Sequence, residues 1–354
     1  MPTTTATSVR VHRLWAALSV LVLFVGFATI AFTSTAGAVP VRTYPNHTSV
    51  ASTTFWVGEI FNVNAADGSQ VCSTYNDKWA FRWSGVSNGS VAGNGTDCAG
   101  APLGGCDGRP SGSGVNFRCV TERRTAANGY FPTSAAVHPR ENPFYLDLPF
   151  DDLNNSAAFR ARGAVVPWAN DPGYAGYATD GNYSFMKNRW VAISKSGATC
   201  YAQVEDAGPG QYNDQAYVFG SNDSRPANRQ FNGAGMDVSP AVNGCLSYSE
   251  LDGDSDVVSW RFVENTDVPA GPWANVVTTS QVNDATPSAA YIASIKPPSG
   301  VPGSSSTTAP SSTTTVTATT PTTTAPTTAT TTTTTTTTES TQQCRPGHHH
   351  RCLY

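Results

Sequence analysis

The sequence predicts an all-β folded region with only short helices. Apolar and polar residues alternate in several short runs, which is typical of half-buried strands. Glycine and proline are frequent, at 31 and 24 residues, and they separate these runs. Long apolar patterns with the 3.6-residue period of an amphipathic helix are absent. We place the folded region at residues 48–282, within the usual length of one all-β domain.

The expected strands are the runs in which β-branched and aromatic residues dominate. In chain order they cover residues 53–58, 144–149, 190–194, 199–204 and 257–263. Lys195-Ser196-Gly197 joins the third and fourth runs and predicts a β-hairpin. One short helix is expected from Pro240 to Leu246, because Ser239 can serve as its N-cap.

The N-terminal residues 1–38 have the pattern of an export signal. Arg10 and Arg13 precede an apolar run over residues 14–32, and Ala36-Gly37-Ala38 is a small-residue cleavage site. An uncleaved anchor is the alternative, because the apolar run is long enough to span a bilayer. Both interpretations place the rest of the chain outside the cytoplasm, and we expect a secreted or cell-wall-associated protein.

The C-terminal part lacks the apolar residues that a folded core needs. We divide it into a linker (283–306), a Thr-rich stalk (307–340) and a Cys/His tail (341–354). A Thr/Pro tract in an exported protein is typical of an O-glycosylated stalk, and a plain spacer is the alternative. The histidines of the tail indicate a basic surface tail rather than a metal site.

The eight cysteines predict disulfides, because their number is even and the chain is exported. None of them forms a CxxC pair. We expect Cys200 to pair with Cys245 in the strand-rich core. Residues 84–119 hold ten glycines and predict a loop insertion, pinned by the cysteines at 72, 98, 106 and 119. Cys344 and Cys352 are close enough to close a ring in the tail.

Composition excludes several function classes. The net charge is −4 with 13% charged residues, and no basic block points to a nucleic-acid partner. A weakly charged, aromatic-rich surface suits a neutral polymer. The sequence has no phosphate loop, Ser-His-Asp arrangement or metal-ligand cluster. We therefore expect no metal, no cofactor and a monomeric protein.

Two acidic motifs about thirty residues apart carry a resemblance to a known family. Asp206-Ala-Gly-Pro follows the hairpin, and Asp237-Val-Ser-Pro-Ala precedes the predicted helix. With the strands at 53–58 and 146–149, this ordered set resembles the double-psi β-barrel of rare-lipoprotein-A-like proteins and expansins. The same barrel occurs in glycoside hydrolase family 45 and in membrane-bound lytic transglycosylase A. The resemblance implies a six-stranded double-psi β-barrel that acts on cell-wall polysaccharide.

The resemblance implies a catalytic acid at Asp237, in a substrate groove. The apolar neighbours Met236 and Val238 favour partial desolvation, which raises the pKa of a carboxyl. Capping of the following helix is the alternative role of this residue. Asp206 is the second catalytic candidate, and an Asp at the start of such a turn also binds backbone amides two residues on.

Glycoside hydrolases of family 45 carry a base Asp directly after the aromatic pair of the first strand. In this sequence Val57 follows Phe55-Trp56, so this second carboxylate is missing. Glu59 could substitute for it, and a solvated Glu is the alternative. The His that accompanies the Asp in rare-lipoprotein-A-like enzymes has no match except His138, in a loop. We expect glycan cleavage of the lytic transglycosylase or glycoside hydrolase type with Asp237 as acid. These departures speak against ordinary hydrolysis, whereas a lytic transglycosylase needs no base for water, because one Asp acts first as acid and then as base. A non-catalytic polysaccharide-binding or wall-loosening module and a protein-binding effector remain alternatives.

Aromatic residues near the motifs favour a glycan partner, because flat rings with polar edges suit stacking on sugar faces. We assign Tyr212 and Tyr217 to the groove, since both follow the Asp206 turn in a polar stretch. Trp56 is a further candidate for substrate binding. Trp190 and Trp260 lie inside strand runs and are expected in the core.

Overall fold

The computed structural model describes residues 42–298 except 61–68, 93–97 and 135–136. The predicted export signal, stalk and tail, including Cys344 and Cys352, lie outside these described residues. Within them, no helix has both the length and the apolar character needed to cross a membrane.

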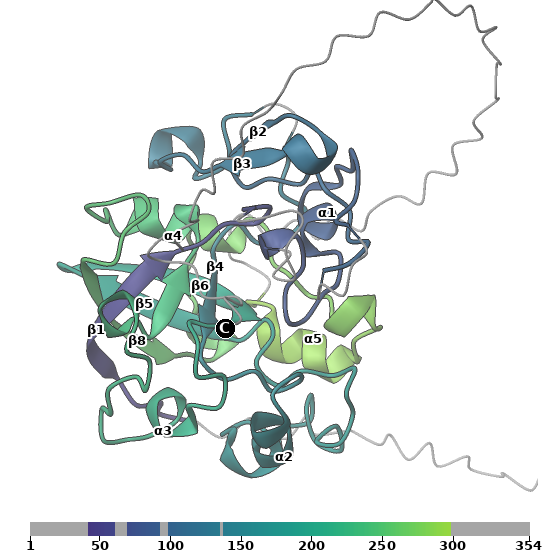
Figure 1. Cartoon of the computed structure of the whole chain (residues 1–354). Helices are drawn as coiled ribbons and strands as arrows, with labels where there is room; N and C mark the ends of the chain where they lie inside the picture. The colour runs from purple at the N-terminus through teal and green to yellow at the C-terminus, as the bar shows by residue number, and fades with distance from the viewer. Residues whose placement is uncertain (1–41, 61–68, 93–97, 135–136, 299–354) are drawn as a thin grey trace, which may run out of the picture. The chain divides into compact units, whose positions relative to one another are not determined.

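Six strands form a closed barrel, which confirms the expected β-barrel with short helices (Figure 1). The order of the strands around the barrel is β1 (His47–Thr54), β7 (Met236–Val238), β4 (Tyr145–Leu148), β6 (Ala198–Ala207), β5 (Trp190–Lys195) and β8 (Asp256–Phe262). β1 pairs with β7 and β4 pairs with β6 in parallel, and the other neighbouring strands pair antiparallel.

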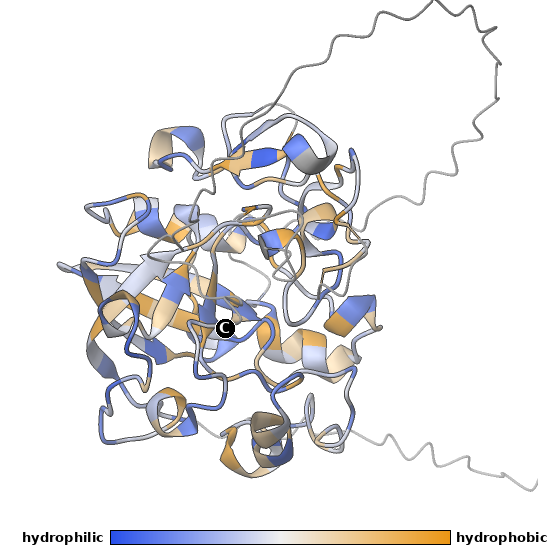
Figure 2. Ribbon diagram, viewed as in Figure 1, coloured by the Kyte–Doolittle hydropathy of each residue, from blue (hydrophilic) through white to orange (hydrophobic). Residues whose placement is uncertain are grey.

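The predicted hairpin is confirmed by β5 and β6, which pair from Trp190–Gln203 to Lys195–Ala198. Ser196 and Gly197 both have positive φ, at 51° and 86°, as a two-residue hairpin turn requires. Along β8 buried and accessible residues alternate, as expected for a strand with one face in the core. Figure 2 shows hydrophilic and hydrophobic residues interspersed along the strands of the barrel.

The first strand differs from its prediction, because β1 begins at His47 and ends at Thr54. Phe55 and Val57 leave the barrel and pack into a second hydrophobic cluster. Gly58 completes this departure with φ 82°, and a Cβ there would lie 1.9 Å from the carbonyl oxygen of Gly105. The backbone at Gly58 therefore packs closely against the backbone at Gly105, beyond the end of β1.

The Cys-rich segment between β1 and β4 has a small core of its own. Trp79, Trp83, Leu103 and Phe117 are buried there, together with Tyr145 of β4. The segment contains α1 (Trp79–Ser84) and a two-stranded ribbon of β2 (Arg109–Ser111) and β3 (Arg118–Val120). Figure 1 shows these elements on one side of the barrel, with α2 and α3 on the opposite side. The predicted insertion is therefore a packed lobe rather than a bare loop.

The expected disulfides of the described region are present. Cys200 pairs with Cys245, as predicted. Within the Cys-rich segment the pairs are Cys72–Cys98 and Cys106–Cys119, whose connectivity the sequence left open.

The predicted helix is α4 (Pro240–Cys245), and the Ser239 hydroxyl accepts the N–H of Val242 at 3.2 Å, as an N-cap does. The other helices are α2 (Ser156–Val165), α3 (Gln215–Val218) and α5 (Ala289–Ile295). Short 3-10 turns cover Ser69–Val71, Gly114–Asn116, Ala126–Asn128, Phe231–Gly233, Asn265–Asp267, Pro272–Ala274 and Val282–Asp284.

The folded region extends beyond the predicted boundary at residue 282. Tyr291 and Ile295 of α5 are fully buried in the main core, and the Tyr291 hydroxyl donates to the carbonyl of Lys187. The two side chains are four residues apart, so they share one helix face. The first part of the predicted linker therefore belongs to the folded domain.

Arg162 of α2 fixes the long loop that precedes β5. Its guanidinium is fully buried and donates to the main-chain oxygens of Asp152, Tyr177, Ala178, Asp180 and Tyr183. Asp152 in turn accepts from the Ser184 hydroxyl and the Phe185 N–H. Neutral carbonyls and one carboxylate thus satisfy a buried cation and hold the loop in one conformation.

Replacing both Cys200 and Cys245 by Ala should lower the free energy of unfolding by about 2–4 kcal/mol, because the disulfide closes a loop of 45 residues in the unfolded chain. Urea denaturation monitored by tryptophan fluorescence measures this change. Wild type and variant under reducing conditions, in which every disulfide is open, are the control and should unfold at nearly the same urea concentration. Equal midpoints for oxidised wild type and variant would contradict the prediction.

Candidate functional site

Three aspartates lie in one row across neighbouring strands. Asp147 of β4 is the register partner of Asp237 on β7 and of Asp206 on β6. On the far side of Asp237, Thr53 of β1 is its partner. Residues directly opposite each other in a sheet project to the same face. The strand pairing therefore brings together the two predicted carboxylates and adds a third, Asp147, between them.

The row is buried on the outer face of the barrel. Asp206, Asp147 and Asp237 are 2%, 0% and 1% exposed. Tyr145 precedes Asp147 by two residues, so both side chains project to the same side of β4. Tyr145 packs in the second cluster with Phe55, whereas Leu146 and Leu148 belong to the main core. The Cys-rich lobe thus covers the face that carries the carboxylates.

Hydrogen bonds hold Asp237 at one end of the row. Its backbone N–H donates to Oδ1 of Asp147 at 2.9 Å. The Thr53 hydroxyl donates to Oδ1 of Asp237. These contacts join β1, β7 and β4 through one side-chain network and fix the position of the Asp237 carboxyl.

Asp206 holds the other end of the row and is also a structural residue. Its Oδ1 accepts the N–H of Ala207 and the N–H of Thr74, each at 2.8 Å. Thr74 follows Cys72, so Asp206 ties the end of β6 to the Cys-rich lobe. The turn-shaping role expected from the sequence therefore extends to a second segment.

Asp237 is the strongly perturbed carboxyl of the site. Burial raises its pKa well above the ordinary value, and the neighbouring carboxylates of Asp147, Glu59 and Asp206 raise it further. Both causes disfavour the charged form, because no water solvates the carboxylate and like charges repel it. Asp237 therefore keeps its proton at pH values at which an exposed Asp has lost it.

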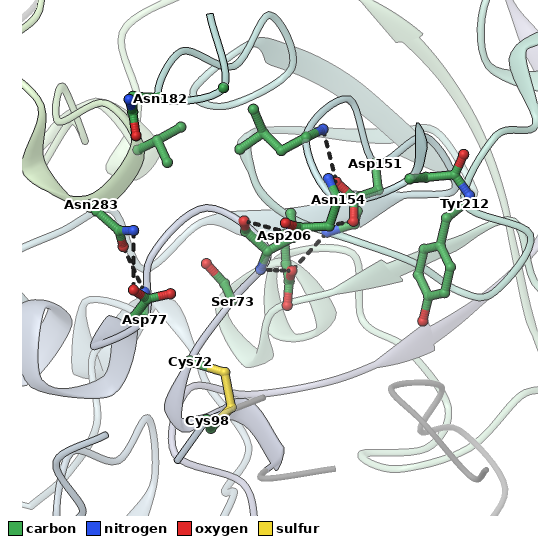
Figure 3. A pocket seen from close by; sticks show the side chains of 16 residues that line it. Cys72, Ser73, Asp77, Cys98, Asp151, Asn154, Asn182, Asp206, Tyr212 and Asn283 are labelled. Carbon is green, nitrogen blue, oxygen red and sulfur yellow. Dashed lines mark hydrogen bonds between the residues drawn. A yellow bond between two sulfur atoms is a disulfide. The ribbon is translucent and has the colours of Figure 1, made fainter. Parts of the chain in front are cut away.

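A polar cavity of about 510 Å³ lies beside the Asp206 end of the row (Figure 3). Asp206 and Asp151 lie close together in its wall, Tyr212 stands on one side, and Asp77 with Asn283 on the other. The remaining wall is mainly asparagine, serine and threonine, with the Cys72–Cys98 disulfide at its edge. Asp237 does not line the cavity.

Tyr212 links the cavity to the buried row. Its half-buried side chain is part of the cavity wall. Burial raises the pKa of Tyr212, and the charges of Asp206, Asp147, Asp151 and Asp237 raise it further. The Tyr212 phenol therefore lies in the cavity wall and interacts electrostatically with both ends of the row. The sequence assigned Tyr212 to a substrate groove, and the structure places it in the cavity wall, so its role in binding stays a prediction.

Three other predicted site residues are buried. Glu59 is 5% exposed and acts on Asp237, so the alternative of a solvated Glu is wrong. Trp56 donates from Nε1 to the carbonyl of Cys119, and the fully buried Tyr217 hydroxyl accepts from Nε1 of Trp260 at 2.7 Å. Neither ring offers a face to a sugar. The groove position expected for Tyr217 is corrected, because α3 turns its side chain into the core.

Two residues of the site, Asp147 and Asp151, were not predicted from the sequence. Asp147 lies between Leu146 and Leu148, and a polar residue at the centre of an apolar strand was a signal that could have identified it. Asp151 is followed by Asp152. Nothing in the local sequence distinguishes Asp151, which lines the cavity, from Asp152, which is fully buried. The exposed His138 does not line the cavity.

Within residues 42–298, apart from the three undescribed gaps, no group of three or more His, Cys, Asp or Glu side chains is arranged to hold a metal ion.

Comparisons with protein-family models, with curated proteins and with solved structures each find no match for the chain.

Replacing Asp237 by Asn should flatten the pH dependence of stability. A carboxyl whose pKa is higher in the folded protein binds more protons when folded, so stability falls as pH rises above the ordinary Asp value of about 3.9. Asn cannot titrate, so the variant should lose less stability than wild type between about pH 5 and pH 8. Urea unfolding at both pH values measures the difference.

The exposed Asp267 supplies the control, because Asp267→Asn also removes one carboxyl but outside the row. Glu141 and Asp152, with pKa values raised by burial to about 7 and about 6, contribute equally to all three proteins. Identical slopes for wild type and Asp237→Asn would show that Asp237 titrates as an ordinary carboxyl.

Proposed function

We propose that this chain is a secreted or cell-wall-associated protein with a double-psi β-barrel that cleaves or remodels cell-wall polysaccharide. Three disulfides in the described region support an extracytoplasmic location. The barrel with two parallel strand pairs, and the Asp206 and Asp237 motifs on the two strands that flank β4, support the resemblance to rare-lipoprotein-A-like proteins and expansins.

The observation that carries the proposal is the raised pKa of Asp237 at the end of a carboxylate row that reaches a cavity wall. Cleavage of a glycosidic bond requires a proton for the departing oxygen, and a carboxyl that stays protonated near neutral pH can supply it. Asp147 holds that proton in place, because ionisation of Asp237 would set two negative charges side by side.

Val57 follows Phe55-Trp56, where family 45 hydrolases carry the base that activates water. This departure favours intramolecular attack by a hydroxyl of the sugar. Asp237 donates its proton to the leaving oxygen as the bond from the sugar C1 breaks. The 6-hydroxyl of the same sugar then bonds to C1 and gives its proton to the Asp237 carboxylate, which restores the acid. Tyr212 and Asp206 both line the cavity, and Asp206 fixes its wall by accepting the N–H of Thr74.

A non-catalytic polysaccharide-binding or wall-loosening module is the second candidate. The 1% exposure of Asp237 and its absence from the cavity wall favour this candidate. Such a module would use the cavity and its asparagine side chains for hydrogen bonds and would leave the glycan intact.

Asp237→Asn should reduce product release from peptidoglycan, cellulose or chitin by about 100-fold or more, the usual loss for a general acid. Chromatography and mass spectrometry of the soluble fraction measure the products, and 1,6-anhydro sugars would identify intramolecular attack. Asp267→Asn is the matched control and should retain wild-type release.

Equal release from wild type and Asp237→Asn would exclude Asp237 as the acid. Polysaccharide pull-down without soluble product would favour the binding module. Failure to bind any of the three polymers would contradict both candidates.

A further inference from the structure

The wall of the 510 Å³ cavity has a strong charge bias. Its described lining includes three carboxylates, Asp77, Asp151 and Asp206, and no Lys, Arg or His. The volume lies in the usual range of small-ligand pockets, about 300–1,000 Å³. A ligand of this cavity therefore meets negative charge and is neutral or positive.

The protein supplies Asp77 and Asp151 with neutral partners. Asp77 Oδ2 accepts from the Asn283 amide at 3.1 Å. Asp151 accepts the N–H groups of Leu153 and Asn154 at Oδ1, and the Thr74 hydroxyl at Oδ2 at 2.6 Å. Among the described residues neither carboxylate has a Lys or Arg within 4.0 Å. Their charge is thus left for a ligand to balance.

The other lining groups match a sugar better than a peptide. Four asparagines, a serine and a threonine present amide and hydroxyl groups, the partners that sugar hydroxyls need. Large apolar side chains are scarce in this wall, where Leu153 and Val282 are the main ones. A peptide with apolar side chains would find little surface to bury there.

We propose that the cavity selects a glycan with free, protonated amino groups, that is, a de-N-acetylated amino-sugar polymer. This inference rests on the proposed function and names its substrate class. Each ammonium group donates three hydrogen bonds. Such groups on the glycan gain charge-assisted contacts with Asp77 and with Asp151. An N-acetylated sugar at the same position loses the charge and adds bulk, so the two forms are discriminated.

The test compares two oligosaccharides of equal length and linkage, a glucosamine tetramer and its fully N-acetylated counterpart. Calorimetric titration of the full chain at slightly acidic pH should show at least about tenfold tighter binding of the glucosamine tetramer, since hydrogen bonds to charged groups have this strength. Added salt should weaken only the charged ligand.

Asp77→Asn and Asp151→Asn should each weaken binding of the glucosamine tetramer about fivefold or more and leave the acetylated tetramer unchanged. Asp77 is exposed, so its variant keeps the fold even if Asp151→Asn does not. Asp267→Asn is the matched charge control and should bind both tetramers as wild type does.

Equal or tighter binding of the acetylated tetramer would overturn the charge selection and leave the proposed glycan function standing. Binding of a trilysine peptide as tight as that of the glucosamine tetramer would overturn the choice of a glycan. Failure of both tetramers to bind, with cleavage or pull-down of another polymer intact, would overturn this inference alone. Failure of every glycan in both experiments would remove the proposed function with it.

Discussion

The register of three strands is the constraint on which the site depends. Antiparallel pairing of β4 with β7 and parallel pairing of β4 with β6 set Asp147 opposite both Asp237 and Asp206. A slip of one residue would move Asp147 to the opposite face and bring Leu146 or Leu148 out of the core. Burial of three carboxyls is costly, so the surrounding structure has to compensate for it.

The compensation comes from elements that are distant in sequence. The Cys-rich lobe covers the row, and Thr74 of the same lobe donates its N–H to Asp206. Thr53 of β1 and the backbone of β7 complete the hydrogen bonds at Asp237 and Asp147. Disulfides hold the lobe together, so the fold stabilises an arrangement of like charges that isolated strands would not adopt. Retention of a proton on Asp237 relieves part of the repulsion.

Local signals in the sequence predicted the parts of the fold that depend on a few neighbouring residues. The β5–β6 hairpin and the Ser239 cap of α4 follow from such signals. The carboxylate row depends on pairings between strands about sixty and about ninety residues apart, and the spacing of residues along the chain does not encode them. Tyr217 illustrates the limit, because a polar stretch predicted exposure while tertiary packing buried it against Trp260.

A direct measurement of the Asp237 protonation state tests the central claim. Carboxyl ¹³C NMR titration of the wild type should show that the pKa of Asp237 lies well above the ordinary Asp value of about 3.9. In Asp147→Asn the transition should move to lower pH, because one repelling charge is gone, and should stay above the ordinary value, because burial is the larger cause. Titration of Asp237 near the ordinary value in both proteins would contradict the account.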